Sequence, residues 1–475
     1  MEFTFILGNG CNFNCKYCFE QNKKGTEKLK FEHAKKLIDD VYSDSNPFNI
    51  DTEEPQILEF IGGEPLLYVD LMREIVEYFI QVLNNTPYNK EYELTFITNG
   101  YLLDTPKVMD FINTYRDHME LNCSIDGIKA SHDKFRLDKS GNPTYDKVWN
   151  NFLNTPTHYK NLKWTLTADT AKYYAEAIQF LLNEQDKCKF LISQHFDTED
   201  TNWATYGYKD FSKCVCELIE WYKGQDPAWI IEHPYRMIRC DYKPSFVAAY
   251  SYGEICTGKK IALDPDGSLV KCICASMVSL DRPDAFVFGH IENTPDADKA
   301  QMYKRASSPL YTFEALKKQE CFRCPVGSFC GNCYVSNYCQ TGMADEVLKC
   351  ACNVHAIKHM EHVFFNNFWI KTYMEYADKP KTYMLSDATM LAGEMFRKDV
   401  ILPKCWALEV LPEDIYNLIC DITEDIGGLV SPLETKFYTQ EQVDIIGAKI
   451  AQQGIGIDKR MGVKEYQLNG RRVCR

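Results

Sequence analysis

The chain has 475 residues and a hydrophobic content of 45%, which is ordinary for a globular protein of two or three domains. Its formal net charge of −14 argues against a nucleic-acid partner, because binding a phosphate backbone requires a basic surface. No apolar run reaches the roughly eighteen residues of a membrane-spanning helix, and the N-terminus lacks the basic region and cleavage site of a signal peptide. The sequence therefore predicts a cytoplasmic protein without a membrane partner.

Strands and helices are expected to alternate along the first half of the chain. Short apolar runs predict strands, and apolar residues at helical spacing predict helices. The strands are expected at 3–7, 57–61, 92–97, 119–125, 162–167 and 189–195, and the helices at 27–41, 71–83, 106–115 and 171–183. This alternation is typical of parallel βαβ units. It favours an α/β fold, a partial (β/α)6 TIM-type barrel, whose active site would lie at the carboxyl ends of the strands.

Three cysteines follow the first expected strand. Cys11, Cys15 and Cys18 have three and two residues between them. They can provide three thiolates to the four irons of a [4Fe–4S] cluster and leave one iron without a protein ligand, whereas an electron-transfer cluster is normally closed by a fourth cysteine. A zinc site or a redox pair would use CxxC spacing and further ligands. The spacing therefore predicts an open cluster that can bind a small chelating ligand.

Polar and glycine-containing segments follow the next three strands. Gly62-Gly63-Glu64-Pro65 follows the second strand, Thr98-Asn99-Gly100 the third, and Ser124-Ile125-Asp126-Gly127 the fourth. Paired glycines let the main chain approach a ligand closely, although each segment also reads as an ordinary turn. The block His132-Asp133-Lys134-Phe135-Arg136 comes soon after, and Arg136 offers the rigid donor fork that suits a carboxylate.

The cysteine motif, CxxxCxΦC with Tyr17 as the aromatic residue, resembles the signature of the radical SAM superfamily. The resemblance implies that the open iron binds the amino and carboxyl groups of S-adenosylmethionine (SAM). The reduced cluster would cleave SAM to methionine and a 5′-deoxyadenosyl radical, which abstracts a hydrogen atom. Because the cofactor carries this chemistry, no catalytic residue is assigned beyond the cluster and SAM.

The strand-end segments resemble the cofactor site of the same superfamily. Residues 62–65 resemble its GGEP motif, whose backbone and glutamate hold the SAM amino group, and 98–100 lie where relatives contact the sugar and methionine. The 124–136 region resembles the S[IL]DG…HDxxR block of SPASM-type members, in which Ser124 and Arg136 would meet the SAM carboxylate and ribose. Leu166 would pack against adenine or belong to the core. The implied cofactor residues are Tyr17, Gly62, Gly63, Glu64, Pro65, Thr98, Asn99, Ser124, Asp126, Arg136 and Leu166.

A second group of cysteines begins around a hairpin expected at 261–272 with an Asp-Pro-Asp-Gly turn. Among the 21 cysteines of the chain, the members of this group are Cys256, Cys272, Cys274, Cys321, Cys324, Cys330, Cys333, Cys339, Cys350 and Cys352. In a reducing compartment so many thiols indicate metal or cluster ligation rather than disulfides. Taken alone, the CxxC pairs are also typical of two zinc knuckles.

The spacing resembles a SPASM domain, which binds two auxiliary [4Fe–4S] clusters, so three clusters are expected in total. The resemblance assigns to the outer cluster Cys321, Cys324, Cys330 and Cys352, and to the inner cluster Cys256, Cys272 and Cys333. The inner cluster's fourth ligand stays open between Cys274, Cys240 and a substrate thiolate. Cys350 competes with Cys352 for the outer cluster. The block resembles the peptide-maturase branch most, with two rather than three residues between Cys330 and Cys333.

Three domains are expected: a radical SAM partial barrel over 1–235, a small cysteine-rich SPASM domain over 236–365, and a mainly helical C-terminal extension over 366–475. In the extension, 412–426 reads as a helix that begins near Pro412 and stops at Gly427. A second helix is expected at 440–450. The extension would either bind the leader of a peptide substrate or cap the barrel.

The resemblance implies a peptide maturase that joins cysteine sulfur to carbon in a ribosomally made peptide, as in thioether-forming ranthipeptide and sactipeptide enzymes. Its partners would be a cysteine-containing precursor peptide, with leader and core, and an electron donor of the flavodoxin or ferredoxin type. An anaerobic sulfatase-maturing enzyme, which makes formylglycine, and a maturase that forms carbon–carbon cyclophanes are the alternatives. A non-catalytic electron carrier or zinc-binding scaffold would leave the segments at the strand ends without a purpose.

Overall fold

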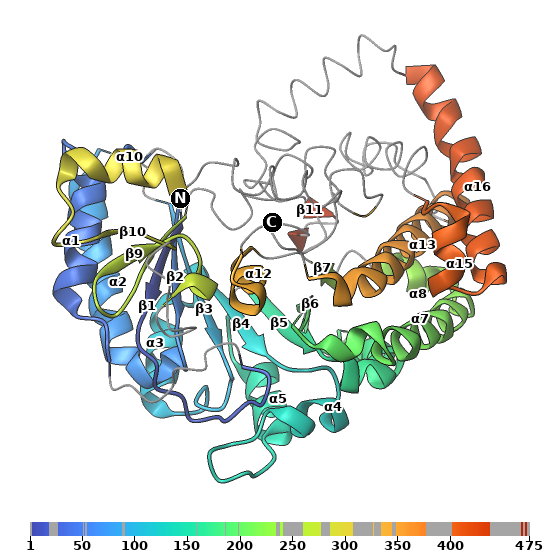
Figure 1. Cartoon of the computed structure of the whole chain (residues 1–475), viewed down its shortest axis with the longest axis horizontal. Coiled ribbons are helices and arrows are strands. Elements are labelled where there is room, and N and C mark those ends of the chain that lie inside the picture. The colour runs from blue at the N-terminus through green and yellow to red at the C-terminus, as the bar shows by residue number, and fades with distance from the viewer. Residues whose placement is uncertain are drawn as a thin grey trace. The chain divides into compact units, whose positions relative to one another are not determined.

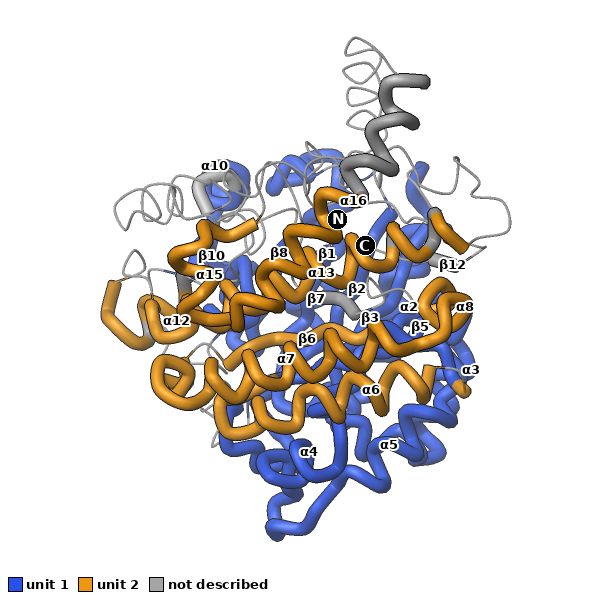
Figure 2. Tube along the Cα trace, turned by 90° about the vertical axis from the view of Figure 1, so that its right-hand side faces the viewer, with its two compact units in different colours: residues 1–165, 188–191, 253–310 blue, residues 166–187, 192–252, 311–475 orange. Residues whose placement is uncertain are grey.

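A computed structural model gives the structure of the chain (Figure 1). It describes residues 2–18, 27–50, 52, 55–87, 91–157, 159–185, 187–197, 199–233, 238–240, 260–276, 286–306, 326, 334–343, 348–376, 401–437, 467–468 and 471–472. Two compact units are present, coloured separately in Figure 2. Unit 1 comprises residues 1–165, 188–191 and 253–310, and unit 2 comprises residues 166–187, 192–252 and 311–475.

Unit 1 contains a parallel sheet whose strands lie side by side in chain order. Its strands are β1 (Glu2–Ile6), β2 (Gln56–Ile61), β3 (Tyr92–Thr98), β4 (Met119–Ser124) and β5 (Tyr159–Leu166). Each strand pairs in parallel with the next, so their carboxyl ends share one edge. Apolar side chains such as Phe5, Phe60 and Phe96 are fully buried, which explains why these strands read as apolar runs.

Helices between the successive parallel strands of unit 1 form the crossovers that a parallel sheet requires, and further helices follow the hairpin strands. They are α1 (Phe31–Tyr42), α2 (Val69–Asn85), α3 (Pro106–Tyr115), α4 (Lys129–Phe135), α5 (Tyr145–Asn154) and α10 (Asp296–Ala306), with short 3-10 helices η1 (Pro65–Tyr68), η2 (Arg116–His118) and η6 (Ile273–Ala275). Helix α3 begins at Pro106, whose missing N–H costs nothing in the first turn. The predicted α/β fold with parallel strands is confirmed.

The expected hairpin extends this same sheet. Strand β8 (Lys260–Leu263) pairs in parallel with β1, β9 (Ser268–Val270) pairs antiparallel with β8, and β10 (Val287–His290) pairs antiparallel with β9. Lys260 Nζ lies 2.7 Å from Glu2 Oε1 and 2.6 Å from Glu59 Oε2. Although burial opposes it, Lys260 lowers the pKa of Glu59 to about 2. This ion pair fastens the hairpin to the first two strands.

Unit 2 is mainly helical. Its elements are η3 (Ala168–Tyr173), α6 (Tyr174–Glu184), β6 (Leu191–Phe196), η4 (Thr201–Ala204), α7 (Gly207–Lys223), α8 (Pro227–Glu232), β7 (Ile238–Cys240), α12 (Tyr334–Thr341), η9 (Lys349–Ala351), α13 (Cys352–Tyr376), α15 (Lys404–Val410), α16 (Glu413–Phe437), β11 (Gln467–Leu468) and β12 (Arg471–Arg472). Strands β6 and β7 are parallel, and β11 and β12 are antiparallel. No helix in the described part of the chain is both long and apolar enough to cross a membrane.

Helix α13 carries a buried polar group into the core of unit 2. Lys358 Nζ lies 2.6 Å from Glu361 Oε2 and donates to the hydroxyl of Tyr174 at 2.7 Å. That hydroxyl donates in turn to Glu361 Oε1 at 2.7 Å. All three residues are buried, so their charges and hydrogen bonds compensate one another where water is excluded. This ring of contacts fixes α13 against the start of α6.

The predicted stop of the C-terminal helix at Gly427 is wrong. Helix α16 runs from Glu413 to Phe437 and passes through Gly427 and Gly428. A glycine inside a helix costs about 1 kcal/mol relative to alanine, which is too little to end a helix by itself. The helix expected at 440–450 lies outside the described residues.

Candidate functional site

The cysteine loop of unit 1 is held directly against the segment that follows β2. Leu7 N donates to Ile61 O at 2.9 Å, where β1 and β2 end. Beyond the strands, Gly63 N donates to Gly8 O at 2.9 Å and Glu64 N donates to Gly10 O at 2.8 Å. Main-chain pairing thus continues past the sheet and into the loop that carries Cys11.

The two glycines of residues 62–65 are required by this close approach of two main chains. A Cβ atom on Gly63 would lie 2.4 Å from Gly10 O, and one on Gly62 would lie 2.5 Å from Gly8 O. Gly62 also has a φ of +138°, which side-chain-bearing residues rarely adopt. These glycines make room for the cysteine loop, and their contact with a ligand stays a prediction.

Glu64 is a fully buried carboxylate at the centre of this edge of the sheet. Its Oε1 accepts from Thr98 Oγ1 at 2.7 Å and from Leu66 N at 3.1 Å, and its Oε2 accepts from Asn99 N at 2.8 Å. Burial raises the pKa of Glu64 to about 7, although these three donors act in the opposite direction. The side chain therefore ties the ends of β2 and β3 together and titrates close to neutral pH.

Asn99 connects β3 to the cysteine loop. Its side-chain amide donates to Asn12 Oδ1 at 2.7 Å and lies 3.9 Å from Cys11 Sγ, while its Oδ1 accepts from Tyr101 N at 3.0 Å. Cys11 itself is buried, with 6% of its surface exposed. The structure therefore brings the predicted residues Cys11, Glu64 and Asn99 together.

The other side of the cysteine loop is bound by the segment 135–139, which the sequence did not connect to it. Asn14 N donates to Leu137 O at 2.9 Å, Lys16 N donates to Phe135 O at 3.3 Å, and Lys139 N donates to Asn12 O at 3.2 Å. These antiparallel contacts join segments more than a hundred residues apart. No local spacing signals such pairing, so it could not be found from the sequence.

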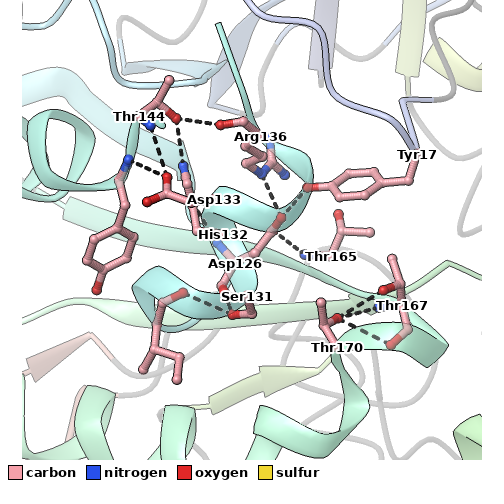
Figure 3. Close-up of polar contacts among 12 residues, drawn as sticks. Tyr17, Asp126, Ser131, His132, Asp133, Arg136, Thr144, Thr165, Thr167 and Thr170 are labelled. Carbon is pink, nitrogen blue, oxygen red and sulfur yellow. Dashed lines mark hydrogen bonds and ion pairs between the residues drawn. The ribbon is translucent and has the colours of Figure 1, made fainter. Parts of the chain in front are cut away.

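Asp126 contacts the segment 135–139 through the side chain of Arg136 (Figure 3). Its Oδ2 accepts from Arg136 Nε at 2.9 Å and from the hydroxyl of Tyr17, and its Oδ1 accepts from Thr165 N at 3.0 Å. The guanidinium of Arg136 also lies 5.3 Å from the centre of the Tyr17 ring. Although burial lowers it, the pKa of Arg136 is held well above its ordinary value by Asp126 and Tyr17. Arg136 is thus a buried, paired cation.

The residues between Asp126 and Arg136 support this arrangement. His132 Nδ1 accepts from Asp126 N at 3.3 Å, and its Nε2 lies 3.1 Å from Thr144 Oγ1. Burial and the nearby Arg136 lower the pKa of His132 well below its usual value, so the ring is neutral at pH 7. Asp133 Oδ1 accepts from the main-chain N–H groups of Thr144 and Tyr145 at 2.9 Å each, which caps α5. His132 and Asp133 therefore have structural partners.

Ser124 and Leu166 occupy the strand ends that the sequence predicted. Ser124 is half-buried at the end of β4, and Leu166 is fully buried at the end of β5. Leu166 is grouped with unit 2, whereas the other predicted cofactor residues belong to unit 1. Pro65 opens the short helix η1, in which Glu64 serves as the N-cap.

Half of the second cysteine group lies outside the described residues: Cys256, Cys321, Cys324, Cys330 and Cys333. Among the described members, Cys272 immediately precedes η6 in unit 1. Cys350 lies in η9 and Cys352 is the first residue of α13, both in unit 2. The auxiliary ligand sets and the domain boundaries 1–235, 236–365 and 366–475 stay predictions.

The chemistry of the loop donors fits an iron–sulfur cluster. Cys11, Cys15 and Cys18 provide three soft thiol ligands on one loop, the donor type that such clusters use. The described residues contain no group of three or more His, Cys, Asp or Glu side chains arranged to hold a single metal ion. A cubane presents its irons at separate corners, so its ligands do not converge on one point as the ligands of a single ion do.

Comparison with known proteins agrees with this arrangement. Residues 5–155 match the family profile described as the radical SAM superfamily. An uncharacterised protein of Methanocaldococcus jannaschii is 32% identical over 136 residues, which cover 29% of this chain and 42% of the relative. A cysteine-type anaerobic sulfatase-maturating enzyme of Clostridium novyi is 27% identical over 225 residues, covering 45% of this chain and 58% of the relative. The chain thus spans about half the length of these curated relatives.

A solved structure, native anSMEcpe with bound AdoMet, has the same fold. The match has a TM-score of 0.54 at 19% identity and covers 79% of this chain and 97% of that one. The profile match begins within β1 and ends just after α5, so it includes the cysteine loop, Glu64 and Arg136. Residues 5–155, which carry the cysteine loop, are therefore similar to the radical SAM superfamily, and the solved structure shows the same fold.

Proposed function

We propose that the chain is a radical SAM maturase that acts on a peptide or protein and forms a cysteine thioether. The assignment to radical SAM chemistry rests on the cysteine loop. The loop is hydrogen-bonded to the segments after β2 and β3 on one side and to 135–139 on the other. It lies within the residues that match the radical SAM profile. A peptide substrate is supported by the relative from Clostridium novyi, whose name describes the maturation of a sulfatase. Solved structures of native anSMEcpe also contain peptides.

In this proposal, Cys11, Cys15 and Cys18 hold a [4Fe–4S] cluster and SAM binds beside it. When bound and reduced, these groups supply a 5′-deoxyadenosyl radical that abstracts hydrogen. The chain's own residues place the reactants: Asn99 positions the loop at Cys11, and Glu64 offers a buried carboxylate that suits the amino group of SAM. Burial of both residues excludes water from the edge at which the cofactor binds.

Two auxiliary clusters held by the second cysteine group complete the proposal. Of the two competing outer ligands, Cys352 is favoured over Cys350. Cys352 begins the 25-residue helix α13, where main-chain N–H groups stabilise a thiolate. Burial raises the pKa of Cys350 and disfavours its thiolate, and Asp200 and Asp197 add to this effect, although the main-chain N–H groups of Cys350 and Ala351 oppose it. An electron donor of the flavodoxin or ferredoxin type would reduce the SAM cluster.

The reaction is tested by incubating the reconstituted enzyme, SAM and reductant with short cysteine-containing peptides encoded beside its gene, and in parallel with a cysteine peptide from a sulfatase. The peptide mass and its reaction with a thiol-alkylating reagent are measured. A thioether removes two hydrogens, keeps the sulfur and abolishes alkylation of the crosslinked cysteine. An unchanged mass contradicts a maturase altogether.

Two other outcomes separate the alternatives. Formylglycine formation from cysteine removes the sulfur, and this candidate is favoured by the name of the Clostridium novyi relative. A carbon–carbon crosslink also removes two hydrogens but leaves the cysteine open to alkylation. Either result would overturn the thioether and retain a radical SAM peptide maturase.

The titration of Glu64 gives the proposed cofactor site a pH dependence. The pKa of Glu64 is raised to about 7, so the carboxylate is mostly ionised at about pH 8 and mostly protonated at about pH 6. Because the ionised carboxylate is the stronger acceptor for the N–H groups of the SAM amino group, the dissociation constant of SAM is expected to rise about tenfold when the pH falls between these values. Glu64→Gln should bind SAM more weakly and lose this pH dependence. Calorimetric titration of the anaerobic enzyme at each pH measures both effects, and an unchanged slope in the variant would assign the titration to another group.

A further inference from the structure

Asp126 is a buried carboxylate that joins three separate segments of unit 1. Both of its oxygens are engaged by protein donors: Oδ2 by Tyr17 and Arg136, and Oδ1 by Thr165 N. Asp126 is 1% exposed and Arg136 is 8% exposed, so the ion pair is shielded from solvent. In Figure 3 dashed lines join the Asp126 carboxylate to the hydroxyl of Tyr17 and to the side chain of Arg136.

The contacts of Asp126 restrict the orientation of Arg136. Its Nε is bound to the carboxylate at 2.9 Å, and its guanidinium lies against the Tyr17 ring at 5.3 Å from the ring centre. A guanidinium is a rigid planar fork, so fixing Nε and one face of the plane also fixes the directions of its terminal N–H donors. The same carboxylate therefore decides where Arg136 points.

Asp126 also acts on the cysteine loop. Tyr17 directly precedes Cys18, and its ring contacts both the guanidinium of Arg136 and the ring of Phe135, whose centre is 5.6 Å away. The neighbouring Lys16 N donates to Phe135 O at 3.3 Å. The side chain of Tyr17 adds a further contact to this segment, because its hydroxyl donates to the carboxylate of Asp126. The position of the loop's last cysteine thus depends on a residue from the end of β4.

We propose that Asp126 is a positioning residue, which orients Arg136 toward SAM and fixes the Tyr17 end of the cysteine loop, and that it does not itself contact SAM. The proposal rests on the proposed function, because it assigns SAM to this edge of the sheet. It reinterprets Asp126, which the sequence resemblance placed among the cofactor contacts. Asp126 Oδ2 accepts from both Tyr17 and Arg136, and this shared acceptor holds the three residues in one buried cluster.

The test uses the full-length enzyme, anaerobically reconstituted and reduced, with SAM as the probe. Asp126→Asn keeps the shape of the side chain but removes the charge that pairs with Arg136. We expect SAM to bind about tenfold more weakly, because a charge-assisted hydrogen bond is lost, and the SAM-induced change in the electron paramagnetic resonance signal of the cluster to be altered. Tyr17→Phe should weaken binding less, because the ring stays against Arg136. The double variant should lose less affinity than the sum of the two single losses, because the Tyr17 hydroxyl and Arg136 share one acceptor, Asp126 Oδ2.

Asp133→Asn is the matched control. Asp133 belongs to the same block, but its carboxylate accepts from the main-chain N–H groups of Thr144 and Tyr145 and so caps α5. It should lower stability without changing the SAM-induced signal. If the Asp126→Asn enzyme fails to retain iron, the SAM affinity and cluster signal of Tyr17→Phe alone test the positioning role. Unchanged SAM affinity and signal in the decisive variant would overturn the positioning role, as would additive effects in the double variant.

The failure of this inference can be told apart from the failure of the proposed function. SAM affinity and the cluster signal are measured without any peptide, so they do not depend on the substrate or on the bond formed. If SAM fails to change the signal of the wild-type cluster, the proposed function itself is wrong. If the wild-type signal responds and Asp126→Asn responds in the same way, only the positioning role is wrong.

Discussion

Replacing Cys15 with alanine is expected to abolish the reductive cleavage of SAM, so that no 5′-deoxyadenosine forms above the level without enzyme. Cys15 is the middle thiol of a three-cysteine loop, and a cluster with two remaining protein ligands is not retained. Iron content should fall by about four per chain, while iron bound by the second cysteine group stays. Iron analysis and chromatography of the products after incubation with SAM and reductant measure both effects.

The control for this substitution is Cys216→Ala. Cys216 is half-buried on α7. It belongs to unit 2, whereas the cysteine loop belongs to unit 1. Its replacement should leave iron content and 5′-deoxyadenosine formation unchanged. Formation of 5′-deoxyadenosine by the Cys15→Ala enzyme would contradict the assignment of the loop to the SAM cluster and, with it, the proposed function.

A second large effect is expected from Gly63→Ala. The added methyl group would lie 2.4 Å from Gly10 O, 2.7 Å from Gly10 C and 2.8 Å from Asn9 O, all of them main-chain atoms. Main chain cannot move aside as a flexible side chain can, so the cysteine loop must be displaced. A misplacement of about 1 Å can cost a hundredfold in rate, and we expect SAM cleavage to fall by about that factor or more. The hydrogen bond from Glu64 N to Gly10 O would be lost as well.

Gly224→Ala serves as the comparison. Gly224 ends α7 with a φ of −81°, and a Cβ there would meet its nearest neighbour, Trp221 O, at an ordinary 3.5 Å. This variant should keep full SAM cleavage. Both variants are assayed for iron content and 5′-deoxyadenosine, and wild-type rates from Gly63→Ala would show that the loop tolerates displacement at this point.

Local sequence was sufficient to predict the parallel sheet, because each strand is an apolar run and each helix has an apolar stripe. Helix α3 was predicted from Pro106 to Tyr115, as the structure has it, since Pro106 is a strong start signal. Helix α16 was predicted to stop too early, because a glycine is only a weak stop signal and helix length depends on what the helix packs against. The pairing of β8 with β1 was not predicted, because strand partners distant in sequence leave no periodic pattern.

Sequence alone determined the chemistry of the site: three cysteines at cluster spacing, followed by GGEP and further polar segments at successive strand ends. These signals are local, since a strand and the turn after it are encoded by a few adjacent residues. Only the tertiary structure decided what those residues touch. Gly62 and Gly63 make room for the cysteine loop, Glu64 bridges two strands, and Asp126 binds Tyr17 and Arg136. The physical reason is that hydrogen bonds and steric contacts between distant segments depend on how the strands are placed side by side, which no single segment encodes.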